Sequence, residues 1–279
     1  MTVRKIQQVI QGMPASDGAG VKLIRSLGSA NHLRADPFLM LDAFSSENPD
    51  DYVAGFPSHP HRGFETVTYL LDGHMLHEDH LGNRGNLKSG GVQWMTAGRG
   101  IIHSEMPQQE NGRMRGFQLW INLPAKEKMK PAGYRDIQAA EIPTASFPGG
   151  NVRVIAGKYE NTSGPVQGGT TEPVYWDVTL DPNGNFIQEI KGKTVYLYPF
   201  EGSLEVEDRP LKTHQGAVLG SGDTVKVKAG ADGARFLVLA ATPIKEPVVQ
   251  YGPFVMNTRE EVEQAVRDYQ TGKLTQAAA

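Results

Sequence analysis

The sequence contains no cysteine among its 279 residues. This absence excludes disulfide bonds, thiolate nucleophiles, zinc–thiolate sites and iron–sulfur clusters. A metal ion in this protein must therefore be held by imidazole nitrogen, carboxylate oxygen or carbonyl oxygen. Imidazole and carboxylate together suit iron, manganese, cobalt, nickel or copper.

The sequence also has little net charge and no long apolar run. Its formal net charge is −3 and its pI is about 6.2, which gives no electrostatic attraction to nucleic acid or to an anionic membrane. No apolar stretch approaches the roughly 18–20 residues that span a bilayer. Residues 1–7 are not followed by the apolar core of a signal peptide. We therefore expect a soluble cytoplasmic protein that binds neither membranes nor nucleic acid directly.

Helical periodicity is scarce and is confined to the region near the C-terminus. There Thr258 and Glu261 form a capping-box pattern, and apolar residues follow at helical spacing from Val262. Gly272 is a plausible stop signal. These features predict one short amphipathic helix over about 258–271.

Most of the remaining sequence is typical of strands and turns. Segments rich in β-branched and aromatic residues, such as 65–71 and 116–123, are bounded by Gly, Asp or Pro. The second half repeats this texture, and the charged, Pro- and Gly-containing segment 124–150 separates the halves. The sequence therefore predicts an all-β protein with two domains of similar plan.

Two short motifs point to a metal centre. His59 and His61 are two residues apart, as are His103 and Glu105. Side chains two apart on a strand point to the same face. If the two strands face each other across a barrel, three imidazoles and one carboxylate converge on a single cation.

Other histidines and one serine are more readily explained by ordinary structural roles than by catalysis or metal binding. A single His-x-His pattern often arises by chance, so the prediction depends on both pairs together. His74, His77 and His80 lie three apart, but glycines bracket them, and we interpret them as part of a solvated hairpin. Ser104 is adjacent to His103, which places the two on opposite strand faces and argues against a hydrolase pair.

Three segments resemble the pirin family of the cupin superfamily. They are HPHRGFETV at 59–67, MTAGRGIIHSEM at 95–106 and YGPFVMNT at 251–258. The resemblance runs along nearly the whole chain. It implies a bicupin, that is, two β-barrels of jelly-roll type, with the short helix near the C-terminus.

The resemblance also implies a division of the chain. Residues 1–130 are expected to form an N-terminal cupin barrel with the metal site, and residues 131–250 a C-terminal cupin barrel without metal. Residues 251–279 form a C-terminal segment that carries the helix. The second half contains one histidine, His214, and no His-x-His pattern, which agrees with a single metal site.

The pirin pattern implies one iron ion, as Fe²⁺, with other divalent transition metals as alternatives. Its ligands would be His59, His61, His103 and Glu105. General cupins use a glutamate four residues after the second histidine, which here is Glu65, and its position in the alternation also suits an inward orientation. We expect Glu105 to be the carboxylate ligand and retain Glu65 as the alternative.

The resemblance implies two functions. The first is a quercetin 2,3-dioxygenase, in which Glu105 is catalytic and the substrates are a small aromatic molecule and O₂. Candidates to line the substrate pocket, or else to form ordinary barrel core, are Phe44, Phe56, Gln118 and Trp120. The second is a redox-responsive iron-binding regulatory protein that binds a transcription factor or a metabolic enzyme, with a nuclear location if the organism is a eukaryote.

Overall fold

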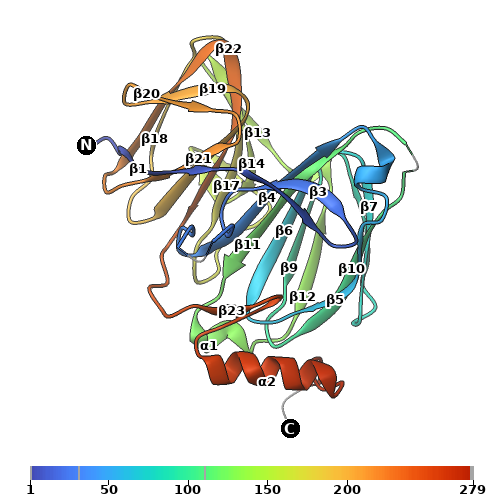
Figure 1. The fold of residues 1–279 in the computed structure, drawn as a ribbon. Helices are drawn as coiled ribbons and strands as arrows, with labels where there is room; N and C mark the ends of the chain where they lie inside the picture. The colour runs from blue at the N-terminus through green and yellow to red at the C-terminus, as the bar shows by residue number, and fades with distance from the viewer. Residues whose placement is uncertain (1, 31, 110, 277–279) are drawn as a thin grey trace. The chain divides into compact units, whose positions relative to one another are not determined.

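The computed structural model describes residues 2–30, 32–109 and 111–276 and consists mainly of β-strands (Figure 1). The chain divides into two compact units. The site unit contains the two histidine motifs and comprises Pro14–Arg25, Phe38–Ala139 and Ile244–Ala279. The second unit comprises Met1–Met13, Ser26–Pro37 and Ala140–Pro243.

The site unit is built on two antiparallel sheets. The larger sheet has the order β12 (Gly133–Ile137), β9 (Val92–Thr96), β6 (Phe64–Asp72), β11 (Met114–Asn122), β4 (Phe38–Ser46), β3 (Val21–Arg25) and β2 (Met13–Asp17). The smaller sheet has the order β5 (Phe56–His61), β10 (Ile101–Pro107), β7 (His74–Asp79) and β8 (Arg84–Lys88). A 3₁₀ turn at Pro49–Asp51 precedes β5.

The inner faces of these two sheets contact each other through polar and aromatic side chains. Glu105 on β10 lies 3.3 Å from the amide nitrogen of Gln118 on β11. The ring of His61 on β5 lies 5.3 Å from that of Trp120 on β11. Towards one end an apolar cluster fills the space, with the buried members Val21, Leu23, Phe44, Tyr52, Leu70, Met75, Leu87 and Met114. The metal motifs therefore lie on an inner face of the unit.

The second unit has one large antiparallel sheet and its own apolar core. The sheet has the order β1 (Ile6–Gln11), β21 (Gln215–Leu219), β19 (Thr194–Val206), β22 (Thr224–Ala241), β17 (Val174–Leu180), β14 (Gly150–Ala156) and β13 (Thr144–Phe147). Smaller strands are β18 (Asn185–Glu189), β20 (Arg209–Lys212), β15 (Lys158–Tyr159) and β16 (Thr162–Ser163), and a 3₁₀ turn lies at Ala139–Glu141. Its core includes Trp176, Phe186 and Phe236.

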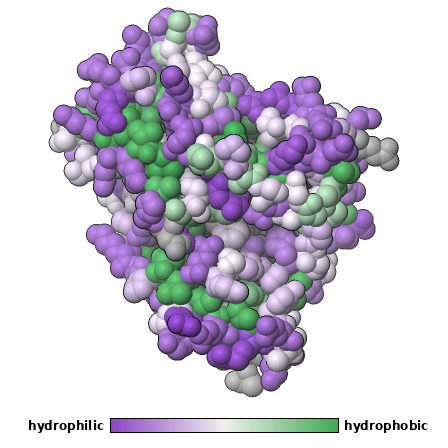
Figure 2. All heavy atoms as spheres, in the orientation of Figure 1, coloured by the Kyte–Doolittle hydropathy of each residue, from purple (hydrophilic) through white to green (hydrophobic). Residues whose placement is uncertain are grey.

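The C-terminal segment returns to the site unit. It contains the hairpin of β23 (Val249–Tyr251) and β24 (Phe254–Met256), followed by α2 (Arg259–Gln270). Thr258 and Glu261 form the expected capping box. The helix buries Val262 and Ala265, and its visible outer face is hydrophilic (Figures 1 and 2). The other α-helix, α1, is the short turn Ala125–Lys128. Among the described residues, no helix is long and apolar enough to cross a membrane.

The fold confirms the predicted all-β architecture of two β units with a short C-terminal helix. The compact units, however, do not follow the order of the chain. β1 pairs with β21, so the first strand lies in the second unit, although the sequence placed it with residues 1–130. The pairing joins segments about 200 residues apart, and strand propensity carries no information on such a partner.

Candidate metal centre

The two histidine motifs lie on neighbouring strands of the smaller sheet. β5 and β10 pair antiparallel, with His103 opposite His59 and Ile101 opposite His61. The two strands do not face each other across a barrel, because they are hydrogen-bonded to each other. The side chains still converge, because directly paired residues of neighbouring strands share a face, as do residues two apart on one strand.

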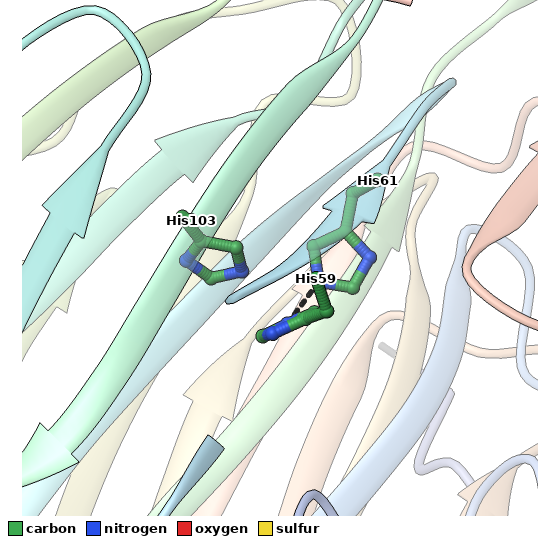
Figure 3. A group of neighbouring side chains, drawn as sticks. All are labelled: His59, His61 and His103. Carbon is green, nitrogen blue, oxygen red and sulfur yellow. Dashed lines mark hydrogen bonds between the residues drawn. The ribbon is translucent and has the colours of Figure 1, made fainter. Parts of the chain in front are cut away.

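The three imidazoles point toward one another in a compact group (Figure 3). The ring centroid of His59 lies 4.7 Å from that of His61 and 4.3 Å from that of His103, and the centroids of His61 and His103 lie 5.0 Å apart. One ligand nitrogen of each ring lies within 4.8 Å of the other two. His61 and His103 are buried, whereas His59 is partly exposed. The group could therefore hold a metal ion that remains open to solvent on the side of His59.

The nitrogen atoms of this group fit a cation. Nδ1 of His59 lies 2.8 Å from the carbonyl oxygen of Pro57, and its Nε2 lies 3.0 Å from Nε2 of His61. Nε2 of His103 is buried and has no hydrogen-bond partner in the described part of the chain. Burial is the first cause that lowers the pKa of His61 and His103 well below the usual value, and neighbouring histidines add to it. Neutral imidazoles with available lone pairs are what metal binding requires.

Glu105 lies beside the three histidines but is held by the larger sheet. Its carboxylate is buried and accepts a hydrogen bond from Oγ1 of Thr68 at 2.7 Å and another from Nε2 of Gln118 at 3.3 Å. Among the described residues, the group of ligand atoms within 4.8 Å contains the three histidines and not Glu105. Its assignment as fourth ligand therefore stays a prediction.

Glu65 faces away from the inner side of the larger sheet. It accepts hydrogen bonds from Thr96 at 2.7 Å and Trp94 at 3.3 Å. The neighbouring positions Thr66 and Thr68 pair with Trp120 and Gln118, which carry the inner face. Glu65 was expected to suit an inward orientation, and this was wrong. The chain turns at Gly63, where φ is +93°, so that the alternation in β5 does not continue into β6.

Two of the predicted substrate-binding residues lie at the metal centre. The indole of Trp120 packs against His61 and lies 4.3 Å, centroid to centroid, from the ring of Phe64. Gln118 contacts both Thr68 and Glu105. These residues place an aromatic surface next to His61 and a polar amide next to Glu105.

The other two predicted substrate residues lie in the apolar cluster of the site unit. Phe44 is a buried member of that cluster, and Phe56 is partly buried against it. Their role in substrate binding stays a prediction.

His77 and Asp79 are functional candidates that the sequence analysis missed. His77 was assigned to a solvated hairpin, but its side chain is 2% exposed and that of Asp79 is 0% exposed. Nδ1 of His77 lies 3.4 Å from Nδ1 of His103. The two-residue spacing of His77 and Asp79 places both on one face of a strand, but it does not show that this strand pairs with β10. Burial tends to raise the pKa of Asp79, but hydrogen bonds from Asn83 and His77 outweigh this effect and lower it.

β5, the strand that carries His59 and His61, is held by contacts with the C-terminal segment. Arg62 follows His61 directly, and its buried guanidinium donates to Asp268 of α2 at 2.7 Å and to the carbonyl oxygens of Arg99 and Leu274. Nζ of Lys128 donates to Gly63, Asn122 and Val255 at 2.6–3.0 Å. These contacts hold the backbone directly after β5, at Arg62 and Gly63.

The comparisons with known proteins decide the family. The family model described as Pirin matches residues 20–121, and the model described as Pirin C-terminal cupin domain matches residues 175–275. The chain belongs to the pirin family. Membership in the pirin family confirms the predicted bicupin fold and the resemblance drawn from the three sequence motifs.

Several members of the pirin family are similar to this chain over nearly its whole length. A Pseudomonas aeruginosa protein named "Putative quercetin 2,3-dioxygenase" is 57% identical over 97% of this chain and 98% of that protein. Human pirin is 41% identical over 97% of this chain and 93% of that protein. A crystal structure titled as quercetin 2,3-dioxygenase from Acinetobacter baumannii matches with a TM-score of 0.90 at 34% identity and covers 98% of both chains.

Proposed function

We propose that this member of the pirin family is an iron-dependent dioxygenase that opens the central ring of quercetin or a related flavonol. The observation that carries the proposal is the group of three imidazoles within 4.8 Å of one another, beside the buried carboxylate of Glu105. The names of the relatives from Pseudomonas aeruginosa and Acinetobacter baumannii support the same reaction.

The proposed cofactor is one Fe²⁺ ion held by His59, His61 and His103, with Glu105 as the fourth ligand. The chain has no cysteine, and a set of imidazoles with one carboxylate also accepts other divalent transition metals. When bound, such an ion supplies Lewis acidity, which lowers the pKa of a coordinated hydroxyl group, and open coordination positions.

In this proposal the residues around the ion orient the flavonol and accept its proton. The carboxylate of Glu105 takes the proton of the 3-hydroxyl group, while Thr68 and Gln118 hold that carboxylate in place. The indole of Trp120 offers an apolar surface to the flat substrate. The enolate then reacts with O₂, both oxygen atoms enter the ester product, and one carbon leaves as carbon monoxide.

The test is an assay of metal-loaded protein with quercetin in the presence and absence of O₂. We expect O₂-dependent loss of flavonol absorbance with release of one carbon monoxide per O₂ consumed. Glu105→Gln should lower the rate by about 100-fold or more. Glu65→Gln is the matched control, because Glu65 is also a hydrogen-bonded carboxylate but lies on the opposite face of the sheet.

Two results would count against the proposal in different ways. No O₂-dependent loss of flavonol with iron, manganese, cobalt, nickel or copper would rule out the reaction. Loss of activity in Glu65→Gln together with retained activity in Glu105→Gln would be consistent with the reaction but would overturn the assignment of Glu105.

A redox-responsive regulatory function is the second candidate. It is favoured by the contact of Arg62, next to His61, with Asp268 on the surface helix α2. A change of one unit of charge at the metal would act on that contact, and a transcription factor or a metabolic enzyme would bind the altered surface. Hydrogen exchange of residues 259–270 should then differ between ferrous and ferric protein. Equal exchange in both states would remove this candidate.

A further inference from the structure

A second pair of polar side chains extends the metal centre on the side of β7. β7 pairs antiparallel with β10, with His77 opposite Glu105 and Asp79 opposite His103. All four side chains therefore share one face of the smaller sheet. The reaction proposed above uses His103 and Glu105, and it leaves the buried His77 and Asp79 without a role.

These side chains form a continuous line of contacts. Oδ2 of Asp79 lies 3.3 Å from Nε2 of His77, and Nδ1 of His77 lies 3.4 Å from Nδ1 of His103. The ring of His77 stacks on that of Tyr134, with centroids 4.2 Å apart and planes at 16°. This stacking fixes the plane of His77, so that one nitrogen faces Asp79 and the other faces His103.

The surroundings of Asp79 make it a hydrogen-bond acceptor. Its Oδ1 accepts from the backbone N–H groups of Leu81 and Asn83 at 2.9 and 3.1 Å, and its Oδ2 accepts from the side-chain amide of Asn83 at 2.8 Å. Among the described residues, the other partners of this carboxylate are all donors. Nε2 of His77 is therefore the nitrogen that carries hydrogen and donates to Asp79.

The remaining protons follow from this assignment. With hydrogen on Nε2, the neutral ring of His77 has its lone pair on Nδ1, where it accepts from Nδ1–H of His103. Nε2 of His103 then bears a lone pair, and this is the buried nitrogen without a hydrogen-bond partner among the described residues.

We propose that His77 and Asp79 are positioning residues that select the tautomer and orientation of His103 in which Nε2 can bind the metal. The inference rests on the metal-binding part of the proposed function. A metal-bound imidazole commonly donates its second N–H to a carboxylate or a carbonyl group. In the same way, Nδ1–H of His59 donates to the carbonyl oxygen of Pro57. His103 instead donates to the imidazole of His77, which in turn donates to the carboxylate of Asp79.

The first test is nitrogen NMR of the histidine rings in metal-free protein at neutral pH. We expect hydrogen on Nε2 of His77 and on Nδ1 of His103, with lone pairs on the other two nitrogens. Hydrogen on Nε2 of His103, or on Nδ1 of His77, would overturn the proposal. This measurement needs no substitution and no metal.

The second test is Fe²⁺ affinity, measured by competition with a chelator, in Asp79→Asn. An amide at this position can donate to Nε2 of His77, which would reverse both tautomers. We expect affinity to fall about 10- to 100-fold and hydrogen to appear on Nε2 of His103 in the NMR spectrum. Glu78→Gln is the matched control, because Glu78 is adjacent, exposed and forms a surface ion pair with Arg84; it should bind Fe²⁺ like the unsubstituted protein.

His77→Phe provides a second variant if Asp79→Asn does not fold. Phenylalanine keeps the ring that stacks on Tyr134 but removes both hydrogen bonds, and the same loss of Fe²⁺ affinity is expected. Unchanged affinity in a folded Asp79→Asn or His77→Phe protein would overturn the proposal. Failure of the unsubstituted protein to bind any metal would instead overturn the proposed function, and the NMR result would still stand on its own.

Discussion

The guanidinium of Arg62 lies 2.7 Å from the carboxylate of Asp268, although the two residues are 206 positions apart. Arg62 is 4% exposed and Asp268 is 19% exposed. The pair joins the strand that carries His59 and His61 to the C-terminal helix. The metal centre therefore depends on a segment that lies far from it in the sequence.

Asp268→Asn should weaken this connection. Arg62 would keep its carbonyl partners but lose its anionic one, and we expect the free energy of unfolding to fall by about 1–3 kcal/mol. Urea unfolding of metal-free protein measures the change. Glu263→Gln is the control on the same helix, because its exposed pair with Arg259 should contribute less than about 0.5 kcal/mol. If both substitutions lowered the free energy of unfolding equally, the contact of Asp268 with Arg62 would contribute no more to stability than the exposed pair.

Lys128→Met should destabilise the protein more strongly. The substitution leaves the carbonyl groups of Gly63 and Val255 and the amide oxygen of Asn122 without their buried donor. We expect a loss of about 2–4 kcal/mol in the free energy of unfolding. The neighbouring exposed Lys126 gives the control, Lys126→Met. A loss below 1 kcal/mol in Lys128→Met would mean that water or another side chain replaces the amine.

The pH dependence of stability should identify the same amine. Burial lowers the pKa of Lys128 to about 8 from 10.5. Between these values the unfolded chain holds a proton that the folded protein has released, so rising pH stabilises the folded state. The difference in unfolding free energy between the unsubstituted protein and Lys128→Met should therefore grow by about 1–3 kcal/mol from pH 7 to pH 10. A constant difference would place the pKa of Lys128 near its ordinary value.

Metal binding should raise the unfolding temperature, and this effect should depend on His61. A ligand at 100 times its dissociation constant stabilises the folded state by about 2.7 kcal/mol. His61→Ala should fold but lose most of this gain when Fe²⁺ is added, as followed by thermal unfolding with and without a chelator. His74→Ala is the control, because His74 lies in the β7–β8 hairpin and contacts Asn86. A full metal-dependent gain in His61→Ala would contradict the ligand assignment.

Local spacing was enough to predict much of the centre and the C-terminal helix. The two-residue spacing identified His59, His61 and His103, and the capping box located the start of α2. Both are local rules, in which backbone geometry fixes the direction of a side chain from its position alone.

The missed pair His77 and Asp79 depends on the pairing of two separate strands. His77 and Asp79 belong to the centre only because β7 pairs with β10, and this register cannot be read from either strand alone. The inward orientation expected of Glu65 failed for a local reason, since the turn at Gly63 starts a new alternation in β6. Sequence periodicity describes a single strand and does not extend across such a turn.

The exchange of terminal segments between the two units has a practical consequence for fragments of this protein. A fragment of residues 14–139 would contain the three histidines but would lack α2 and β24. It would leave Arg62 without Asp268 and Lys128 without the carbonyl group of Val255. Ile102, which packs against Phe254 and Ala265, would be open to water. We therefore expect that the site unit cannot be obtained by a single cut at the linker, and that a fragment of it must also carry the C-terminal segment with β24 and α2.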